Sequence, residues 1–294
     1  MLNKIETRIM KSMKLAIVTD STAFLPEEVK THPDLYILPI PVIIDGKIYN
    51  EDIDIHAEEY YDILKNSKDF PTTSQPALGE VVDLYEKLAK AGYDTILSIH
   101  LSSGISGFVN TLYSLKDSIE GITIVPFDSE ITSMPMGNMV AKALQLKDEG
   151  KTIDEIVNYL EFIRKNTKVY LIVDDLNNLV RGGRLTNGAA IIGGLLKIKP
   201  ILTFDEGKIV LHEKIRSSKK AFARAEELII EKAQQLDCPL KFYIIHGNHL
   251  EAALEEKAKL QAQYPSAEFE IGYFGPVIGT HLGEKAIGIA ISAE

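Results

Sequence analysis

The sequence is poor in cysteine, in long apolar runs and in basic residues. Its single cysteine, Cys238, excludes an internal disulfide and fits a reducing cytoplasm. No run of about 18 apolar residues occurs, so a transmembrane helix is not expected. The opening stretch "MLNKIETRIMKSMK" is charged throughout and lacks the apolar core of a signal peptide. We therefore expect residues 1–13 to be a poorly ordered extension or a short helix.

The shortage of basic residues also limits the partners of the protein. The formal net charge is −10, and contacts to phosphates need a basic patch, so nucleic acid is not expected as a partner. Hydrophobic residues make up 45% of the 294 residues, which is an ordinary globular composition. The chain can therefore bury a sizeable core.

Up to about Lys168, strand-like and helix-like segments alternate. The apolar runs "KLAIVTD", "LYILPIPVII", "DTILSIHL" and "ITIVPFDS" predict strands, and Asp45-Gly46 predicts a hairpin turn after the second run. The spacing of apolar residues predicts helices over residues 56–66, 78–92, 108–119, 134–149 and 152–166. This alternation predicts an α/β domain with a parallel sheet and helices on both faces.

After Lys168 the pattern changes to strands in quick succession. They are "VYLIVDD", "KPILTFDEGKIVLHEKI", "KFYIIHG" and "AEFEIGYFG", with a hairpin turn at 205–207 and helices at 217–235 and 249–263. This order predicts an α+β domain with an antiparallel or mixed sheet and helices on one side. We expect an extension over residues 1–13, an N-terminal domain over 14–167 and a C-terminal domain over 168–294. No flexible linker separates the domains, so the ligand is expected in the cleft between them.

Polar segments lie beside these elements at four places. They are "TDST" (19–22), "TTSQP" (72–76), "SSGISG" (102–107) and "GTHLG" (279–283). Open α/β sheets bind ligands at the carboxyl ends of their strands, and free N–H groups at a helix N-terminus receive anions. Ser106 and its neighbours therefore form either an anion site or an ordinary helix cap. The same two interpretations hold for Thr73 and Ser74.

Arginines and histidines stand in further turns. The motif "RGGR" ends in Arg184 and is either an exposed basic turn or part of a site. His281 is likewise either a structural or solvated residue or a ligand contact. His246 and His249 have no third ligand at a zinc-site spacing, so no metal is expected. Ser106 lacks the G-x-S-x-G spacing of hydrolases, and no phosphate loop with a lysine occurs.

Six motifs occur in a characteristic order, "VTDSTA", "TSQPALGE", "IHLSSGISG", "RGGRL", "IKPIL" and "GPVIGTHLGEKAIGI". Together they resemble the DegV family of bacterial fatty-acid-binding proteins, which includes the acyl-binding subunit of the bacterial fatty acid kinase. The resemblance extends from about Lys14 to Ala293. It implies an α/β, two-domain DegV-like fold, with a long acyl chain buried between or beside the domains.

The resemblance also implies a site for the fatty acid carboxylate. It places Thr73 and Ser106 on the carboxylate, with Arg184 and His281 beside them. The two hydroxyl-bearing motifs add the supporting residues Ser74, Ser103, Gly104 and Gly107. Two hydroxyls can each donate a hydrogen bond to a carboxylate, and a nearby cation keeps it ionised. Arginine is always charged, whereas a histidine near its usual pKa of about 6.5 can gain or lose its charge.

The predicted function is that of a binding protein, not an enzyme. It would bury a long-chain fatty acid and present the carboxylate to a separate fatty acid kinase, because the sequence shows no ATP site of its own. No cofactor is expected, the expected location is the cytoplasm, and peripheral membrane contact would serve lipid exchange. The alternatives are a soluble lipid-transfer or sensing protein without a kinase, and a serine esterase or thioesterase that uses Ser106 and His281.

Two apolar segments are candidates for the pocket lining, with ordinary core as the alternative for both: 189–196 ("AAIIGGLL") and 134–140 ("MPMGNMV"). The chain departs from the family pattern at Phe108, where threonine is common, and at Glu284-Lys285, where Pro-Gly is common. Phe108 either alters the pocket wall or packs in its helix. The second departure affects the turn beside His281.

Overall fold

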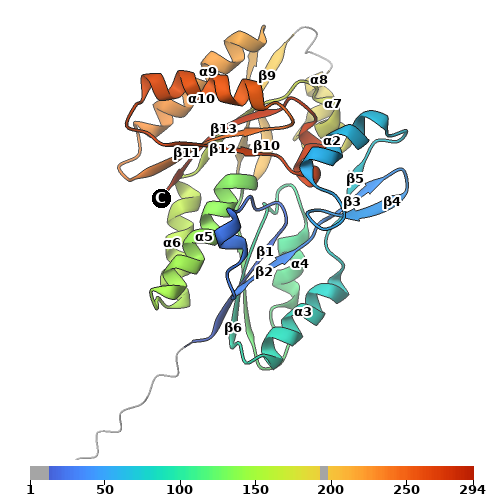
Figure 1. Ribbon diagram of the computed structural model, residues 1–294, viewed down its shortest axis with the longest axis vertical. Helices are drawn as coiled ribbons and strands as arrows, with labels where there is room; N and C mark the ends of the chain where they lie inside the picture. The colour runs from blue at the N-terminus through green and yellow to red at the C-terminus, as the bar shows by residue number, and fades with distance from the viewer. Residues whose placement is uncertain (1–12, 193–197) are drawn as a thin grey trace, which may run out of the picture.

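The computed structural model describes residues 13–192 and 198–294, in which two main sheets lie one above the other (Figure 1). The lower one in that view is a parallel sheet in the order β2-β1-β6-β7, formed by Leu35–Leu38, Leu15–Asp20, Thr95–His100 and Thr123–Asp128. Every residue of β1 and β6 is buried, as in parallel sheets that are covered on both faces. The predicted parallel α/β arrangement is confirmed.

Helices cover both faces of the parallel sheet. α3 (Leu78–Lys90) and α4 (Phe108–Leu115) pack against the face that carries Val18. α5 (Ser133–Asp148) packs against the opposite face, with α6 (Ile153–Lys165) beside it. The second sheet covers the other side of α5, so this helix is buried nearly all round at its N-terminal half.

The second sheet is mixed, in the order β10-β9-β8-β13-β11-β12. Its strands are Lys208–Ile215, Lys199–Asp205, Lys168–Ile172, Ile287–Ala293, Leu240–His246 and Phe269–Tyr273. β11 and β12 run parallel, and the other neighbouring pairs are antiparallel. α9 (Ser218–Ala233) and α10 (Leu250–Gln263) lie on its outer face, away from the parallel sheet in Figure 1. The prediction of a mixed sheet with helices on one side is confirmed.

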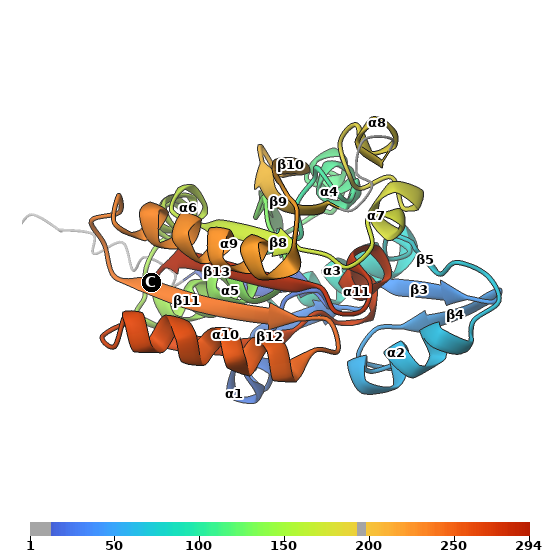
Figure 2. The ribbon, with the colours of Figure 1, turned by 90° about the horizontal axis from the view of Figure 1, so that it is seen from above.

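A small antiparallel sheet with α2 projects at one end of the molecule (Figure 2). It has the order β4-β3-β5, and the elements are Lys47–Asn50, Pro41–Ile44, Thr72–Thr73 and, for α2, Ala57–Asn66. The predicted hairpin turn is confirmed, since Asp45 and Gly46 have φ values of 48° and 77°. The prediction of one strand over "LYILPIPVII" is wrong, because the run divides between two sheets. Pro39 and Pro41 supply no N–H group, so β2 cannot continue through them.

Four short helices complete the described fold: α1 (Glu27–Lys30), α7 (Asn177–Arg181), α8 (Gly188–Ile192) and α11 (Pro276–Leu282). The sequence patterns predict none of them, nor strand β13. α11 begins with a proline and ends at Gly283, whose φ is 80°. Both residues are typical helix boundary signals.

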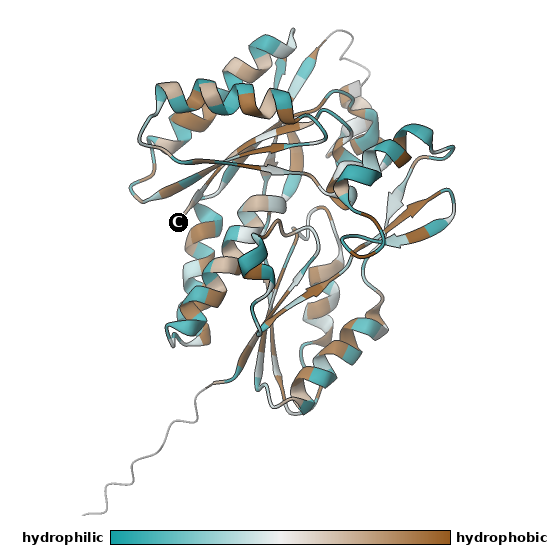
Figure 3. Cartoon of the chain, viewed as in Figure 1, coloured by the Kyte–Doolittle hydropathy of each residue, from teal (hydrophilic) through white to brown (hydrophobic). Residues whose placement is uncertain are grey.

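Hydrophobic residues follow the central strands of both sheets, whereas the outer sides of the helices are largely hydrophilic (Figure 3). One cluster of buried side chains extends from Leu15 and Ile17 in the parallel sheet, through Met136 of α5, to Ala290 and Ala293 in the mixed sheet. The two sheets therefore share a core. Within the described ranges, no helix is long and apolar enough to cross a membrane.

Candidate functional site

A pocket lies between the mixed sheet and the loops that follow β6 and β7 of the parallel sheet, and residues of β5 and α11 complete its walls. It contains about 810 Å³ of space that no atom fills, counted out to its mouth. Its apolar lining consists of Ile40, Leu101, Ile105, Ile131, Pro135, Val169, Leu171, Phe204, Ile209, Ile245, Phe274, Val277, Ile278 and Leu282. Walls of this kind favour an apolar ligand.

Thr73, Ser106, Arg184 and His281 all line this pocket. Thr73 Oγ1 lies 2.8 Å from His281 Nε2, although the two residues are 208 positions apart in the sequence. Arg184 Nε donates a hydrogen bond to the carbonyl oxygen of Ile105, the residue before Ser106, at 3.1 Å. Two hydroxyls, a guanidinium and an imidazole thus meet on a wall that is otherwise mainly apolar.

The supporting residues fall into two groups. Ser74 and Gly107 line the pocket, whereas Ser103 and Gly104 are not part of its lining. Ser103 N instead donates a hydrogen bond to Asp128 Oδ1 at 3.1 Å. The motif "SSGISG" therefore contributes both lining residues and residues that hold its own loop in place.

The loop 102–107 docks onto the turn between β9 and β10. Ser102 Oγ donates to the carbonyl oxygen of Gly207 at 2.6 Å and accepts from Gly104 N at 3.1 Å. A Cβ atom at Gly104 would lie 2.3 Å from the same carbonyl oxygen, so only glycine fits there. The loop that carries Ser106 is therefore fixed by both parts of the chain.

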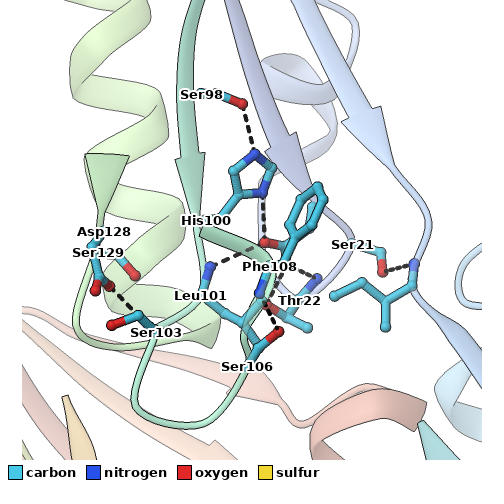
Figure 4. A network of polar contacts seen from close by, with 12 residues as sticks. Ser21, Thr22, Ser98, His100, Leu101, Ser103, Ser106, Phe108, Asp128 and Ser129 are labelled. Atoms are coloured by element: carbon cyan, nitrogen blue, oxygen red, sulfur yellow. Dashed lines mark hydrogen bonds and ion pairs between the residues drawn. The ribbon is translucent and has the colours of Figure 1, made fainter. Parts of the chain in front are cut away.

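A buried chain of hydrogen bonds braces the start of this loop (Figure 4). Asp20 Oδ2 accepts from Leu101 N at 3.0 Å and lies 2.9 Å from His100 Nδ1. His100 Nε2 lies 2.7 Å from Ser98 Oγ, and Asp20 Oδ1 accepts from Thr22 N at 3.1 Å. Ser98, His100 and Asp20 are fully buried and none of them lines the pocket. This Ser-His-Asp series is out of reach of a substrate, so its role is structural and explains the "TDST" motif.

His281 is electrostatically unlike the histidine expected from the sequence. Burial, together with the nearby charge of Arg184, lowers the pKa of His281 to about 4. The ring is therefore neutral at pH 7, and the expectation of a charge that changes near pH 6.5 is wrong. A Cβ atom at Gly182 would lie 2.4 Å from His281 Nδ1, so the first glycine of "RGGR" makes room for the ring.

The expectation that residues 134–140 line the pocket is largely wrong. Of residues 134–140, only Pro135 lines the pocket, because α5 runs between the two sheets and its methionines, such as Met136, pack in the shared core. Residues 189–191 are not among the lining residues, and the side chain of residue 192 and residues 193–196 lie outside what the structure describes. Core packing, the alternative, holds for the methionine segment.

The two departures from the family pattern have local explanations. Phe108 is 1% exposed and packs edge-on against His100, with 4.7 Å between the ring centroids. It therefore packs in its helix and does not form the pocket wall. Glu284 pairs with Lys65 at 3.0 Å and accepts from Asn248 Nδ2 at 2.7 Å, so charge pairing holds the turn after α11.

Three polar lining residues were not singled out by the sequence, namely Gln75, Thr132 and Ser133. Gln75 directly follows Ser74, and a Cβ atom at Gly107 would lie 2.7 Å from its Nε2 atom. Thr132 and Ser133 directly precede the methionine segment, and a polar pair at that position resembles an ordinary helix start. Only the fold reveals that they face the pocket.

The fold and site define a class of α/β proteins with two main sheets and an apolar pocket with a polar end, which lies between one sheet and the loops of the other. The chain belongs to the DegV family: the model of that family, described as that of an uncharacterised protein, matches residues 14–294. The DegV domain-containing protein lmo2514 of Listeria monocytogenes is 47% identical over 281 residues, which cover 96% of this chain and 99% of the relative. The resemblance stated from the motifs is therefore confirmed.

Solved structures agree with the family assignment. The fatty acid binding DegV family protein SAG1342 from Streptococcus agalactiae has a TM-score of 0.91 and 43% identity, with 96% of this chain and 99% of that chain covered. DegV from Bacillus subtilis, described as a fatty acid binding protein, has a TM-score of 0.87 and 43% identity, with coverage of 96% and 100%. The DegV-like fold implied by the resemblance is confirmed.

Proposed function

We propose that this protein binds a long-chain fatty acid in the cytoplasm of a bacterium, with the carboxylate held by Thr73 and Ser106. The observation that carries the proposal is a single pocket whose apolar walls end at a pair of hydroxyls and a guanidinium. The two solved relatives are described as fatty acid binding proteins, which supports the same ligand class. No cofactor takes part in this proposal.

The apolar walls and the polar end contribute differently to binding. Each buried methylene contributes about 0.8 kcal/mol, so a chain of about 14 methylenes supplies roughly 11 kcal/mol before the costs of association. Each hydrogen bond to the charged carboxylate adds about 1.5–3 kcal/mol. The chain therefore supplies most of the affinity, and the polar end fixes the orientation.

Substitution of the two hydroxyls tests the carboxylate site. Thr73→Val and Ser106→Ala each remove one donor, so each should weaken the binding of a fluorescent fatty acid by about tenfold. Ser103→Ala is the matched control, because Ser103 lies in the same loop outside the pocket lining. Its affinity should stay within about twofold of the wild type. Wild-type affinity in both hydroxyl variants would contradict the site.

Mass spectrometry of lipid extracted from the native protein tests the binding function itself. We expect a long-chain fatty acid in stoichiometric amount. If extraction yields no lipid and added fatty acid does not stabilise the delipidated protein, the proposed function is wrong.

We further propose that a separate fatty acid kinase phosphorylates the bound carboxylate. Arg184 would stabilise the negative charge that develops during transfer, and neutral His281 would support it through hydrogen bonds. Arg184→Gln and His281→Ala should therefore lower the rate of acyl phosphate formation by about tenfold or more, while the dissociation constant changes by less than about threefold. The measurement needs the kinase, ATP and a coupled assay. A normal transfer rate with weakened binding would show that the division of roles is incorrect.

The two alternatives differ from this proposal in their geometry or partners. For an esterase, His281 would have to contact Ser106, but its Nε2 atom contacts Thr73. His281 Nδ1 has no hydrogen-bond partner among the described residues, so no carboxylate orients the ring as in a triad. A lipid-transfer or sensing protein would use the same pocket, with peripheral membrane contact for lipid exchange. The kinase assay separates that alternative from the main proposal.

A further inference from the structure

Two buried hydroxyls in the pocket have no part in the proposed carboxylate site. Thr132 and Ser133 are 7% and 3% exposed, and both line the pocket. Neither Thr132 Oγ1 nor Ser133 Oγ has a hydrogen-bond partner among the residues that the structure describes. Nearly all buried hydroxyls in proteins are paired, because an unpaired one carries the full cost of its lost hydration. These two therefore lack a polar partner among the described residues, which a polar group of a ligand could supply.

Neither hydroxyl of the pair has a hydrogen bond to a carboxylate-site residue. Ser133 N donates to the carbonyl oxygen of Thr22 at 3.0 Å, beside the parallel sheet. Ser133 also lines a second, smaller cavity, whose walls include Phe24, Glu51 and Tyr273. That cavity has none of the four carboxylate-site residues in its lining. Ser133 thus lies where the pocket adjoins a cavity that none of the four carboxylate-site residues lines, and we take this side as the one that would hold the acyl chain.

The local backbone also favours a polar ligand group at this position. Thr132 is the N-cap of α5, a helix of 16 residues, and its side chain makes no capping hydrogen bond. The N-terminus of a helix carries a partial positive charge that favours an oxygen atom. Ser133 has a φ of 58°, and backbone strain of this kind in a non-glycine residue is concentrated at ligand sites.

We infer that Thr132 and Ser133 form a second polar subsite, which accepts a hydroxyl group carried partway along the acyl chain of a long-chain fatty acid. This inference rests on the proposed function and names the ligand class more narrowly. The ligand hydroxyl donates to one side-chain oxygen and accepts from the other hydroxyl. In a wholly apolar pocket the same group would be buried without a partner and would weaken binding.

A titration series tests the subsite. The probes are stearate and a set of monohydroxystearates with the hydroxyl at successive carbons along the chain. We expect at least one isomer to bind delipidated wild-type protein about tenfold more tightly than stearate does. Thr132→Val and Ser133→Ala, combined in one variant, should abolish this preference and leave the affinity for stearate within about threefold of the wild type.

Thr19→Val is the matched control. Thr19 Oγ1 is also buried without a partner among the described residues, but Thr19 is not part of the pocket lining. This variant should keep the wild-type preference for the hydroxylated isomer. Because the ratio of the two affinities is measured within each variant, a loss of stability does not imitate the expected result.

The possible outcomes separate this inference from the function on which it rests. If stearate binds and every monohydroxystearate binds more weakly, the subsite does not exist. If the double variant keeps the wild-type ratio of affinities for the hydroxylated isomer and stearate, other residues bind the hydroxyl and the inference is wrong. If the double variant binds stearate more tightly and the wild type prefers no isomer, the hydroxyls hold an ordered water instead. If neither stearate nor any isomer binds, the proposed function itself fails.

Discussion

At the scale of single residues, Glu51 connects the N-terminal part of the chain to the helix that carries His281. Ser21 Oγ lies 2.6 Å from Glu51 Oε2, and Val277 N, in the first turn of α11, donates to Glu51 Oε1 at 2.9 Å. Glu51 is 2% exposed, and burial raises the pKa of its carboxyl group to about 8. The group is therefore protonated at neutral pH in the folded protein.

The raised pKa of Glu51 gives the stability a specific pH dependence. The folded state binds this proton more tightly than the unfolded state, in which the pKa has its ordinary value of 4.5. The stabilisation is therefore complete below pH 4.5 and is lost as the pH rises through about 8. The glutamine in Glu51→Gln stays neutral at every pH. The melting temperature of this variant minus that of the wild type should therefore increase as the pH rises from about 5 to about 8.5.

Thermal melts at several pH values measure this difference. Glu59→Gln, which changes an exposed carboxyl group on α2, is the control and should show no such trend. A difference between Glu51→Gln and wild type that stays constant with pH would mean that Glu51 titrates near its ordinary value.

The sequence could predict which residues belong to the candidate site, but not the contacts between them. The motifs identify Thr73, Ser106, Arg184 and His281, and the structure places all four on one pocket. The contact between Thr73 and His281 spans 208 positions, so no local pattern can reveal it. The lowered pKa of His281 has the same origin, because burial by distant elements causes it.

At the scale of elements, α7 and α11 set the position of the histidine through one glycine. Gly182 ends α7 with a φ of −69°, which any residue can adopt, so only the space beside it requires glycine. In Gly182→Ala the new methyl group would overlap the ring of His281, whose Nδ1 atom is 2.4 Å from the ideal Cβ position. The ring must move and its contact with Thr73 is lost. As for His281→Ala, the rate of acyl phosphate formation should fall by about tenfold, while the dissociation constant of the fatty acid changes by less than about threefold.

Gly79→Ala is a suitable control for that variant. Gly79 lies in α3, and a Cβ atom there has nothing within 4 Å. Replacing a helical glycine by alanine should stabilise the protein by about 0.5–1 kcal/mol and leave both binding and acyl phosphate formation unchanged. A wild-type rate of acyl phosphate formation in Gly182→Ala would mean that the ring position does not matter for transfer.

The elements that the sequence predicted are those with strong periodicity or clear turn residues. β1, β6, α3 and both hairpins follow from such signals. β13 does not, because Gly288 and Ala290 have weak strand propensity even though the strand is central and wholly buried. α11 was not predicted because its Gly279 has a low helix propensity. The glycine is tolerated there because Tyr61 packs closely against it.

At the scale of the whole molecule, both the pocket and the shared core are formed where the two halves of the chain pack together. We propose that residues 14–167 and 168–294 are two domains, with the ligand between them. Their apolar faces meet across α5, and one cluster of buried side chains includes Leu15 from the first and Ala293 from the second. Neither part could expose its share of this cluster to water without losing hydrophobic stabilisation. The two domains should therefore unfold together.

Calorimetry of the delipidated protein should show one unfolding transition, with calorimetric and van't Hoff enthalpies that agree. A fatty acid bound between the domains stabilises both of them at once, because it binds only the folded state. At a free concentration of about 100 times the dissociation constant, it should stabilise the protein by about 2.7 kcal/mol, or about 5 °C for a chain of this size. The single transition should move as a whole, and Ser106→Ala at the same ligand concentration should move less. Two transitions, of which only one responds to the ligand, would mean that the domains fold independently and that one of them alone holds the fatty acid.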